Sequence, residues 1–189
     1  MLYVGTDGAA SANGRLTCKA AYGYIIINHT DMDVVKLAFE EKNPDKELDC
    51  FEGSGNIPEV IYNGKKMHPS NNRAELTGVI KALEFIQEEN LTGDITIFSD
   101  SKYTIGSITY WADNWFKNPA KYKLSAKQNL DLIIHARDLI TKMPDREIKF
   151  KHVRGHKEPP EKFDDWLPWL LNYKADKLCS KQNKKCNKR

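Results

Sequence analysis

The sequence is poor in cysteine: its 189 residues contain four, and no two of them lie close together along the chain. They are Cys18, Cys50, Cys179 and Cys186. This spacing indicates neither a zinc site nor a disulfide framework. The sequence also lacks an apolar run of membrane-spanning length, and its first residues lack the signal-peptide pattern of a basic, then apolar, then small-residue stretch. We therefore expect an intracellular protein that does not interact with a membrane.

Neither sign of charge dominates, because the formal net charge is only +3, but the charges are unevenly distributed. Residues 31–60 contain nine acidic residues and three lysines, whereas residues 117–157 contain eleven Lys and Arg residues and four acidic ones. Trp115, Phe116 and Tyr122 lie in or beside this basic segment. Basic segments with interleaved aromatic residues are typical of phosphate-backbone binding. A solvated helix surface would have a similar composition, and both interpretations stay open at this point.

The length and a hydrophobic content of 40% fit one domain with a proper core. Alternation and apolar runs predict strands at residues 2–6, 19–27, 34–39, 95–99 and 147–153. Helical spacing predicts helices at residues 70–90, from residue 101, at 124–143 and at 173–181. Residues 40–56 are rich in charged residues and contain proline and glycine, a composition that predicts a loop. This order of elements predicts an α/β fold with a mixed sheet.

The helix predicted at residues 70–90 has a clear apolar face, made by Leu76, Val79, Ile80, Leu83 and Ile86. Glu75 shares a side with buried positions of this helix, so its carboxylate points inward at the first turn. One interpretation is a capping box, with Asn72 as the N-cap residue and Glu75 reaching back to it. The alternative is that Glu75 belongs to a cluster of carboxylates, which depends on where the other acidic residues lie.

Two of these carboxylates follow predicted strands. Asp7 ends the first strand, and Asp100 ends the strand at residues 95–99. A right-handed crossover through the helix makes these strands parallel and brings their carboxyl ends to one sheet edge. Asp7 and Asp100 would then lie beside Glu75. Each also has a local explanation, Asp7 as part of a turn and Asp100 as part of a helix cap. Three converging carboxylates would repel one another unless a cation lay among them, and oxygen ligands favour Mg²⁺ or Mn²⁺ over zinc.

Around these residues the sequence resembles a known family. The runs Thr-Asp-Gly at 6–8, Asn-Asn-Arg-Ala-Glu-Leu at 71–76 and Ser-Asp-Ser-Lys-Tyr at 99–103 resemble the three acidic motifs of type 1 ribonuclease H. Val-Arg-Gly-His at 153–156 resembles its late histidine loop, and residues 172–178 resemble its fourth acidic motif. Residues 110–132 resemble the tryptophan-bearing basic helix and handle. The motifs occur in collinear order over nearly the whole chain.

The resemblance implies a ribonuclease H-like fold with a five-stranded mixed sheet and helices on both faces. It implies one domain over residues 1–180, followed by a basic tail at 181–189. Two stretches are longer than is typical of the family, at about residues 28–70 and in the loop 157–171. The chain is expected to be a monomer in the cytoplasm or with the nucleoid or nucleus.

The resemblance also implies a metal-dependent endonuclease that cuts the RNA strand of RNA·DNA hybrids and leaves 5′-phosphate and 3′-hydroxyl ends. Asp7, Glu75, Asp100 and Asp176 would hold two divalent ions, Mg²⁺ or Mn²⁺. His156 would move protons or help product leave, although it could also be an ordinary exposed loop histidine. Spacing alone would favour Asp164 or Asp165 as the fourth carboxylate, whereas local context favours Asp176, expected at the start of the last helix.

Substrate-binding residues follow from the same resemblance. Amide groups both donate and accept hydrogen bonds, so Asn71 and Asn72 are candidates for contacts to the 2′-hydroxyl groups that distinguish RNA from DNA. Lys102 lies in the third acidic motif. The DNA backbone would be bound by aromatic and basic residues of the handle, namely Trp111, Trp115, Lys117, Lys121 and Lys123.

Two other classes of function are compatible with this fold. One is a non-catalytic module that binds hybrids or duplexes, which would be expected to lack one or more of the four carboxylates. The other is a different nuclease, such as a junction resolvase or an exonuclease. The run at residues 71–75 and the basic handle favour the ribonuclease H interpretation.

Overall fold

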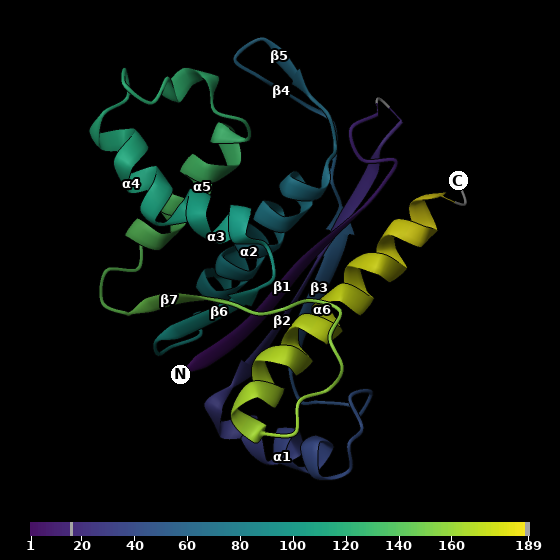
Figure 1. Cartoon of the computed structure of the whole chain (residues 1–189). Helices are drawn as coiled ribbons and strands as arrows, with labels where there is room; N and C mark the ends of the chain where they lie inside the picture. Colours follow the sequence, from purple (N-terminus) through teal and green to yellow (C-terminus); the bar gives the residue numbers. More distant parts are fainter. Residues whose placement is uncertain (16, 188–189) are drawn as a thin grey trace.

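A five-stranded mixed sheet forms the centre of the computed structural model, which describes residues 1–15 and 17–187, with side chains through residue 185 (Figure 1). Its strand order is β3-β2-β1-β6-β7. The strands are β1 (Leu2–Ser11), β2 (Lys19–Asn28), β3 (Phe51–Asn56), β6 (Ile95–Ser99) and β7 (Ile148–His152). β1 and β2 pair antiparallel, as do β2 and β3, whereas β1, β6 and β7 run parallel. A separate hairpin pairs β4 (Val60–Tyr62) with β5 (Lys65–Met67).

Helices cover both faces of this sheet, as the resemblance implied. They are α1 (Met32–Glu40), α2 (Asn71–Glu88), α3 (Lys102–Ile108), α4 (Tyr110–Lys117), α5 (Leu130–Thr141) and α6 (Phe163–Asn187). Short 3₁₀ turns lie at His29–Asp31 and Leu124–Ala126. Figure 1 shows α2, α3 and α5 on one side of the sheet and α6 on the other. None of the described helices is long and apolar enough to span a membrane.

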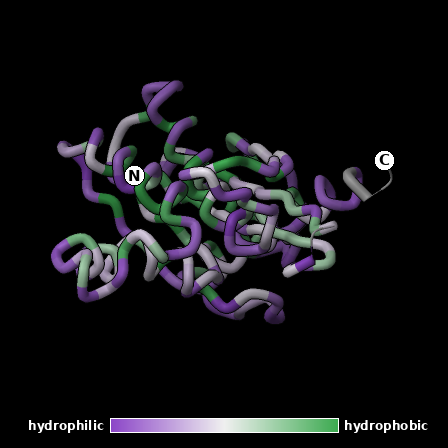
Figure 2. The backbone as a smooth tube through the Cα atoms, turned by 90° about the horizontal axis from the view of Figure 1, so that it is seen from above, coloured by the Kyte–Doolittle hydropathy of each residue, from purple (hydrophilic) through white to green (hydrophobic). Residues whose placement is uncertain are grey.

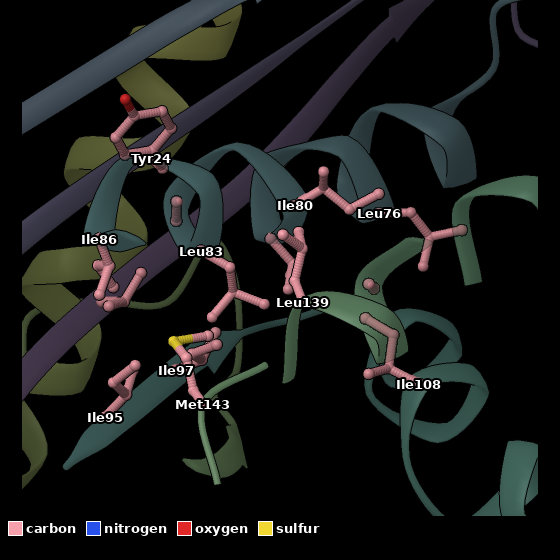
Figure 3. Close-up of a cluster of buried hydrophobic side chains, with 14 of the residues drawn as sticks. Tyr24, Leu76, Ile80, Leu83, Ile86, Ile95, Ile97, Ile108, Leu139 and Met143 are labelled. Carbon is pink, nitrogen blue, oxygen red and sulfur yellow. The ribbon is translucent and has the colours of Figure 1, made fainter. Parts of the chain in front are cut away.

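Each face has its own apolar core. The first joins the inward face of α2 to β6 and α5, through side chains such as Leu83, Ile97 and Leu139 (Figure 3). The second joins α6 to α1 and β2, through side chains such as Trp166 and Val35. Seen from above, hydrophobic segments lie at the centre and hydrophilic ones around them (Figure 2). The sheet is therefore held on both sides, which fixes the strand ends where the candidate site lies.

The elements that carry the acidic residues agree with the sequence predictions. β1 and β6 are adjacent and parallel, with Gly5 opposite Phe98. α2 crosses between them, and all five predicted core residues from Leu76 to Ile86 are buried. A turn at Asn63-Gly64 joins β4 to β5, and both of its residues have positive φ angles.

The predictions for residues 34–39 and 51–56 are wrong, whereas residues 41–50 form a loop as predicted. Residues 34–39 are part of helix α1, where Met32, Val35 and Ala38 are buried at helical spacing. The third strand is instead β3, within the predicted loop. Its two glycines leave room for tyrosine rings of β2, since a Cβ at Gly53 would lie 2.5 Å from the Tyr24 ring. Those glycines, which suggested a loop, are what allow this edge strand to pack.

The predicted last helix at residues 173–181 is too short. α6 begins at Phe163 and extends to Asn187. The expected loop at 157–171 and the expected tail at 181–189 are therefore largely helical, and residues 188–189 lie outside the described residues. Pro168 lies inside the helix. It removes one N–H donor, but burial of Trp166, Leu167, Leu170 and Leu171 in the second core stabilises these first turns.

Three boundaries also differ from the predictions. Ser70, not Asn72, caps α2, because its Oγ accepts a 3.3 Å hydrogen bond from the Arg73 N–H. Of the two interpretations of Glu75, the capping box is therefore wrong. β1 continues to Ser11, so Asp7 lies inside the β1–β2 ladder and not at the end of β1. The helix predicted at 124–143 begins only at Leu130.

Candidate active site

The three predicted carboxylates meet at the sheet edge. One oxygen each of Asp7, Glu75 and Asp100 lies within 4.8 Å of the others. β1 provides Asp7 two residues past its last pairing with β6, and β6 ends just before Asp100. α2 provides Glu75 from its first turns. Gly8 allows this approach, because a Cβ there would lie 2.5 Å from the Glu75 backbone nitrogen.

Burial makes this cluster electrostatically costly. Asp7 and Glu75 are 5% and 4% exposed, and Asp100 is half-buried. Burial and the neighbouring Asp100 raise the pKa of Asp7 to about 7. Burial, Asp7 and Asp100 raise the pKa of Glu75 well above its usual value. Burial also raises the pKa of Asp100, against the opposing effects of His156 and His152. A bound cation would offset this repulsion.

The donor chemistry fits a divalent cation. All three side chains offer carboxylate oxygens, which are the ligands that hard cations prefer. Glu75 Oε2 is buried and receives no hydrogen bond from any described residue. Because buried oxygen atoms are normally paired, this one is available to a ligand. The cluster could therefore hold a divalent metal ion.

The fourth predicted residue approaches from the other face of the sheet. Ligand atoms of Asp7, Asp176 and Cys179 also lie within 4.8 Å of one another. Asp176 lies in the middle of α6, not at its start as predicted, and accepts a 3.2 Å hydrogen bond from the Ser180 hydroxyl. Asp164 and Asp165 lie in the first turn of α6, about 17 Å away along its axis.

A cleft of about 470 Å³ opens over the carboxylates. Asp7, Glu75, Asp100 and Asp176 line it, together with Asn71 and His156. The Asn71 side-chain amide donates a 3.4 Å hydrogen bond to Glu75 Oε1. His156 is exposed on the loop after β7 and has a left-handed backbone, with φ of 53°. The cleft therefore gathers the predicted acidic residues, one predicted amide and the predicted histidine.

The other predicted substrate-binding residues lie outside this cleft. Asn72 is in the first turn of α2, and Lys102 is exposed at the start of α3. The aromatic residues of α4 form a small cluster, in which the Trp111 and Trp115 rings are tilted by 31° and their centroids are 6.3 Å apart. Lys127 Nζ lies 4.7 Å from the Trp115 ring centroid. The predicted basic residues Lys117, Lys121 and Lys123 are exposed at the end of α4 and in the segment after it.

The sequence analysis missed three residues near the site. Arg73 is buried and makes a two-pronged ion pair with Asp131, at 3.0 and 2.7 Å, which joins α2 to α5. His152 ends β7, and its Nε2 lies 3.1 Å from the Asp100 carbonyl oxygen. Cys179 is fully buried beside Asp7, and burial together with Asp7, Asp176 and Glu75 raises the pKa of its thiol. Two of them had a sequence signal, because Cys179 lies three residues after Asp176 on one helix and Arg73 lies in the motif at residues 71–76.

The mixed sheet, its covering helices and the acidic cleft at the carboxyl end of its central strands define an α/β protein of the ribonuclease H-like class. The model of the RNase H family matches residues 1–184. The chain therefore belongs to the RNase H family, whose members are nucleases, and it is an enzyme of this type.

Individual relatives agree with this assignment. The chain is 48% identical over 88 residues to a Ribonuclease H of Schizosaccharomyces pombe, a match that covers 46% of this chain but only 30% of that relative. It is 28% identical over 157 residues to Ribonuclease H of Clostridium botulinum, covering 81% of this chain and 82% of the relative. The fold resembles the crystal structure of LC11-RNase H1 in complex with an RNA/DNA hybrid, with a TM-score of 0.60, 16% identity and 99% coverage of both chains.

Proposed function

We propose that this protein hydrolyses the RNA strand of RNA·DNA hybrids as an endonuclease and leaves 5′-phosphate and 3′-hydroxyl ends. The observation that carries the proposal is the convergence of Asp7, Glu75 and Asp100 within 4.8 Å in a chain of the RNase H family. The hybrid-bound state of the similar LC11-RNase H1 supports the choice of substrate.

Asp7, Glu75, Asp100 and Asp176 hold the metal in this proposal. Two divalent cations, Mg²⁺ or Mn²⁺, would supply activation of the attacking water and stabilisation of the leaving 3′ oxygen. Asp7 and Glu75 come from rigid elements and are buried, so they keep their positions without substrate. Asp100 and Asp176 are more exposed, and they line the open side of the cleft where a phosphodiester would enter.

His156 and Asn71 have separate roles at the edge of the cleft. His156 is exposed on a loop and can reach solvent, which suits it to carry a proton to or from the cut strand. Asn71 holds Glu75 by its amide group and leaves its carbonyl oxygen free to accept from a ribose 2′-hydroxyl. Asn72 and Lys102 would make further contacts with the hybrid next to the cleft.

The handle would bind the uncut DNA strand. Trp111 and Trp115 are partly exposed neighbours on α4, with ring planes tilted by 31°, and Lys117, Lys121 and Lys123 present positive charge close by in sequence. Contacts of this kind bind phosphates and sugars without reading bases. The hybrid would then lie across the cleft with one strand over the carboxylates and the other on the handle.

A duplex panel tests this function directly. Labelled RNA·DNA, RNA·RNA and DNA·DNA duplexes of one sequence are incubated with and without Mg²⁺, and the product ends are mapped. We expect metal-dependent internal cuts in the RNA of the RNA·DNA duplex alone. Binding without cleavage would instead identify a hybrid-binding module. Cleavage of the DNA·DNA duplex, or removal of nucleotides from strand ends, would identify another nuclease.

A further inference from the structure

A second hollow lies beside the acidic cleft, along helix α6. It has a volume of about 820 Å³ and is rich in lysine: Lys174, Lys177, Lys181, Lys184 and Lys185 line it. Among the described residues that line it, only Glu52 and Asp176 are acidic. Asp176 and Ser180 line both hollows, so the two adjoin at these residues. Figure 1 shows this end of α6 on the opposite side of the sheet from α4.

The lysines follow the period of the helix. Lys177, Lys181 and Lys185 are spaced four residues apart and therefore form one row. Lys184 lies eight residues after Asp176, in the row that contains Asp176 and Ser180. Eight residues of helix rise about 12 Å. Nucleotides of a duplex strand rise about 3.4 Å each along the axis. Lys184 would thus lie about three to four nucleotides from a phosphate held at Asp176.

Helix stability does not explain why lysines are gathered in rows along α6. Like charges four residues apart destabilise a helix. The helix dipole favours cations in the last turn only, which applies to Lys184 and Lys185 but not to Lys177 and Lys181. Lys177 pairs with Asp45, and Lys174 donates to the Lys46 carbonyl oxygen. Lys181, Lys184 and Lys185 are exposed and make no ion pair with any described residue.

We propose that this lysine groove binds the sugar-phosphate backbone of the strand that is cut, on one side of the scissile phosphate. The charge of the groove matches a polyanion, and Asp176 and Ser180, which line both hollows, place the groove next to the cleft where the substrate would be cut. Together with the handle on the other side of the sheet, the groove gives the enzyme two basic surfaces that flank the carboxylates. The proposal rests on the proposed function, because the cleft must act on a nucleic acid.

The test compares two triple variants of the full chain. In the first, Lys181→Gln, Lys184→Gln and Lys185→Gln are combined. In the matched control, Lys36→Gln, Lys42→Gln and Lys142→Gln remove the same charge from exposed positions outside both hollows. Both are made with Asp100→Asn as well, so that hybrid binding is measured without cleavage at several salt concentrations. Thermal melting confirms that each variant is folded.

We expect the groove variant to bind the hybrid at least about tenfold more weakly at low salt, with the salt slope reduced by about 0.9 for each phosphate that the protein no longer neutralises. The control should change both quantities much less. When Asp100 is retained, the groove variant should also need a higher hybrid concentration to reach half of its maximal rate. Its single-turnover rate at saturating hybrid should be unchanged. Equal effects of the two triple variants would overturn the proposal.

Hybrids of unequal arm length add a second readout. Each carries one short RNA segment in an otherwise DNA strand, with either the 5′ or the 3′ arm shortened to about two nucleotides, which is less than the reach from Asp176 to Lys184. Shortening one arm should abolish the difference between the natural chain and the groove variant, while shortening the other should preserve it. A difference that persists with both short arms contradicts a groove on one side of the cut. Absence of all cleavage with a changed salt slope would contradict the proposed function but not the groove.

Discussion

At the residue scale, the candidate site is a set of carboxylates held together against their mutual repulsion. Asp7 and Glu75 are almost completely buried, and burial together with the charge of Asp100 raises the pKa of both. Proteins retain such arrangements where function requires them. The same repulsion makes the metal-free protein less stable than its packing alone would allow, and this has a measurable consequence.

The first prediction concerns Asp7 and pH. Its pKa is about 7 in the folded protein against a usual value of 3.8. The folded state therefore binds the proton more tightly, and stability is lost as pH rises from about 4 through about 7. Asp7→Asn removes this loss. In EDTA, urea denaturation should find the variant more stable than the natural chain at pH 8, by about 2 to 4 kcal/mol, with the difference shrinking toward pH 5. A variant that is less stable at pH 8 would contradict this.

The second prediction concerns the fourth carboxylate. Asp176 shares the cleft with Asp7, whereas Asp164 and Asp165 lie at the far end of α6. Asp176→Asn should weaken cleavage strongly and raise the Mg²⁺ concentration needed for half of the maximal rate. The matched double change, Asp164→Asn with Asp165→Asn, should leave both close to normal. Loss of activity in the double variant alone would place the fourth ligand in the first turn of α6.

Not every important residue could be found from the sequence. Asp7, Glu75 and Asp100 were predictable because a strand-helix-strand crossover brings strand ends and the first helical turn together. His152 was not, since only the pairing of β7 with β6 brings it to Asp100. Arg73 lies inside a motif that suggested chemistry, yet its side chain is occupied by Asp131, 58 residues away.

At the scale of elements, α2 does two things at once. Its first turns deliver Glu75 to the cleft, and Arg73 ties the same turns to the start of α5. The Arg73 and Asp131 side chains are 4% and 14% exposed. Removing one partner of a buried pair leaves an uncompensated charge, which is far more costly than losing an exposed pair.

The third prediction follows from this pair. Arg73→Ala should lower the free energy of unfolding by about 3 kcal/mol, whereas Lys36→Ala, which breaks the exposed pair with Asp33, should cost less than about 1 kcal/mol. Replacing Arg73 and Asp131 together by leucine should cost less than the sum of the single changes. Denaturant unfolding measures all of these variants. Equal costs for Arg73→Ala and Lys36→Ala would show that the buried pair is not structural.

The fourth prediction concerns the handle at α4. Changing Lys117, Lys121 and Lys123 together to Ala should weaken hybrid binding and flatten its salt dependence by about 0.9 log units for each phosphate left without a lysine partner. The single-turnover rate at saturating substrate should stay close to that of the natural chain, because these residues lie outside the acidic cleft. An unchanged salt slope would mean that this segment is only a solvated surface.

Errors of the sequence analysis at this scale have physical causes. α1 contains Val34 and Val35, which favour strands in isolation, but burial of its face against α6 decides the outcome. β3 carries glycines because tyrosine rings of β2 occupy the space of their side chains. Residues 163–171 were predicted as part of an enlarged loop, but burial of Trp166, Leu167, Leu170 and Leu171 makes them the first turns of α6. Each case is a long-range contact overriding a local preference.

At the scale of the whole molecule, the sheet separates two helical layers. Residues from both layers meet at the edge of the sheet where the cleft lies. α2 and α6 lie on opposite faces, yet Glu75 and Asp176 reach the same cleft past β1. The overall α/β class and the acidic edge could be predicted from motif order. The acidic segment at residues 31–60 contributes no residue to the described lining of the cleft, and its helix α1 and strand β3 were not predicted. Its Asp45 pairs with Lys177, so this segment supports α6 from the side.

The most direct test of the account is Asp100→Asn, because the amide keeps the shape of the side chain and removes the charge that would hold metal. Cleavage of a labelled RNA·DNA hybrid is followed at saturating Mg²⁺, beside hybrid affinity and thermal stability, with Asp145→Asn at an exposed turn as the control. The account predicts that Asp100→Asn loses cleavage by a factor of about a thousand or more, as expected for an electrostatic group at the reacting centre, while affinity and stability remain near normal. Cleavage by Asp100→Asn at a rate close to that of the Asp145→Asn control would contradict a metal-holding carboxylate centre.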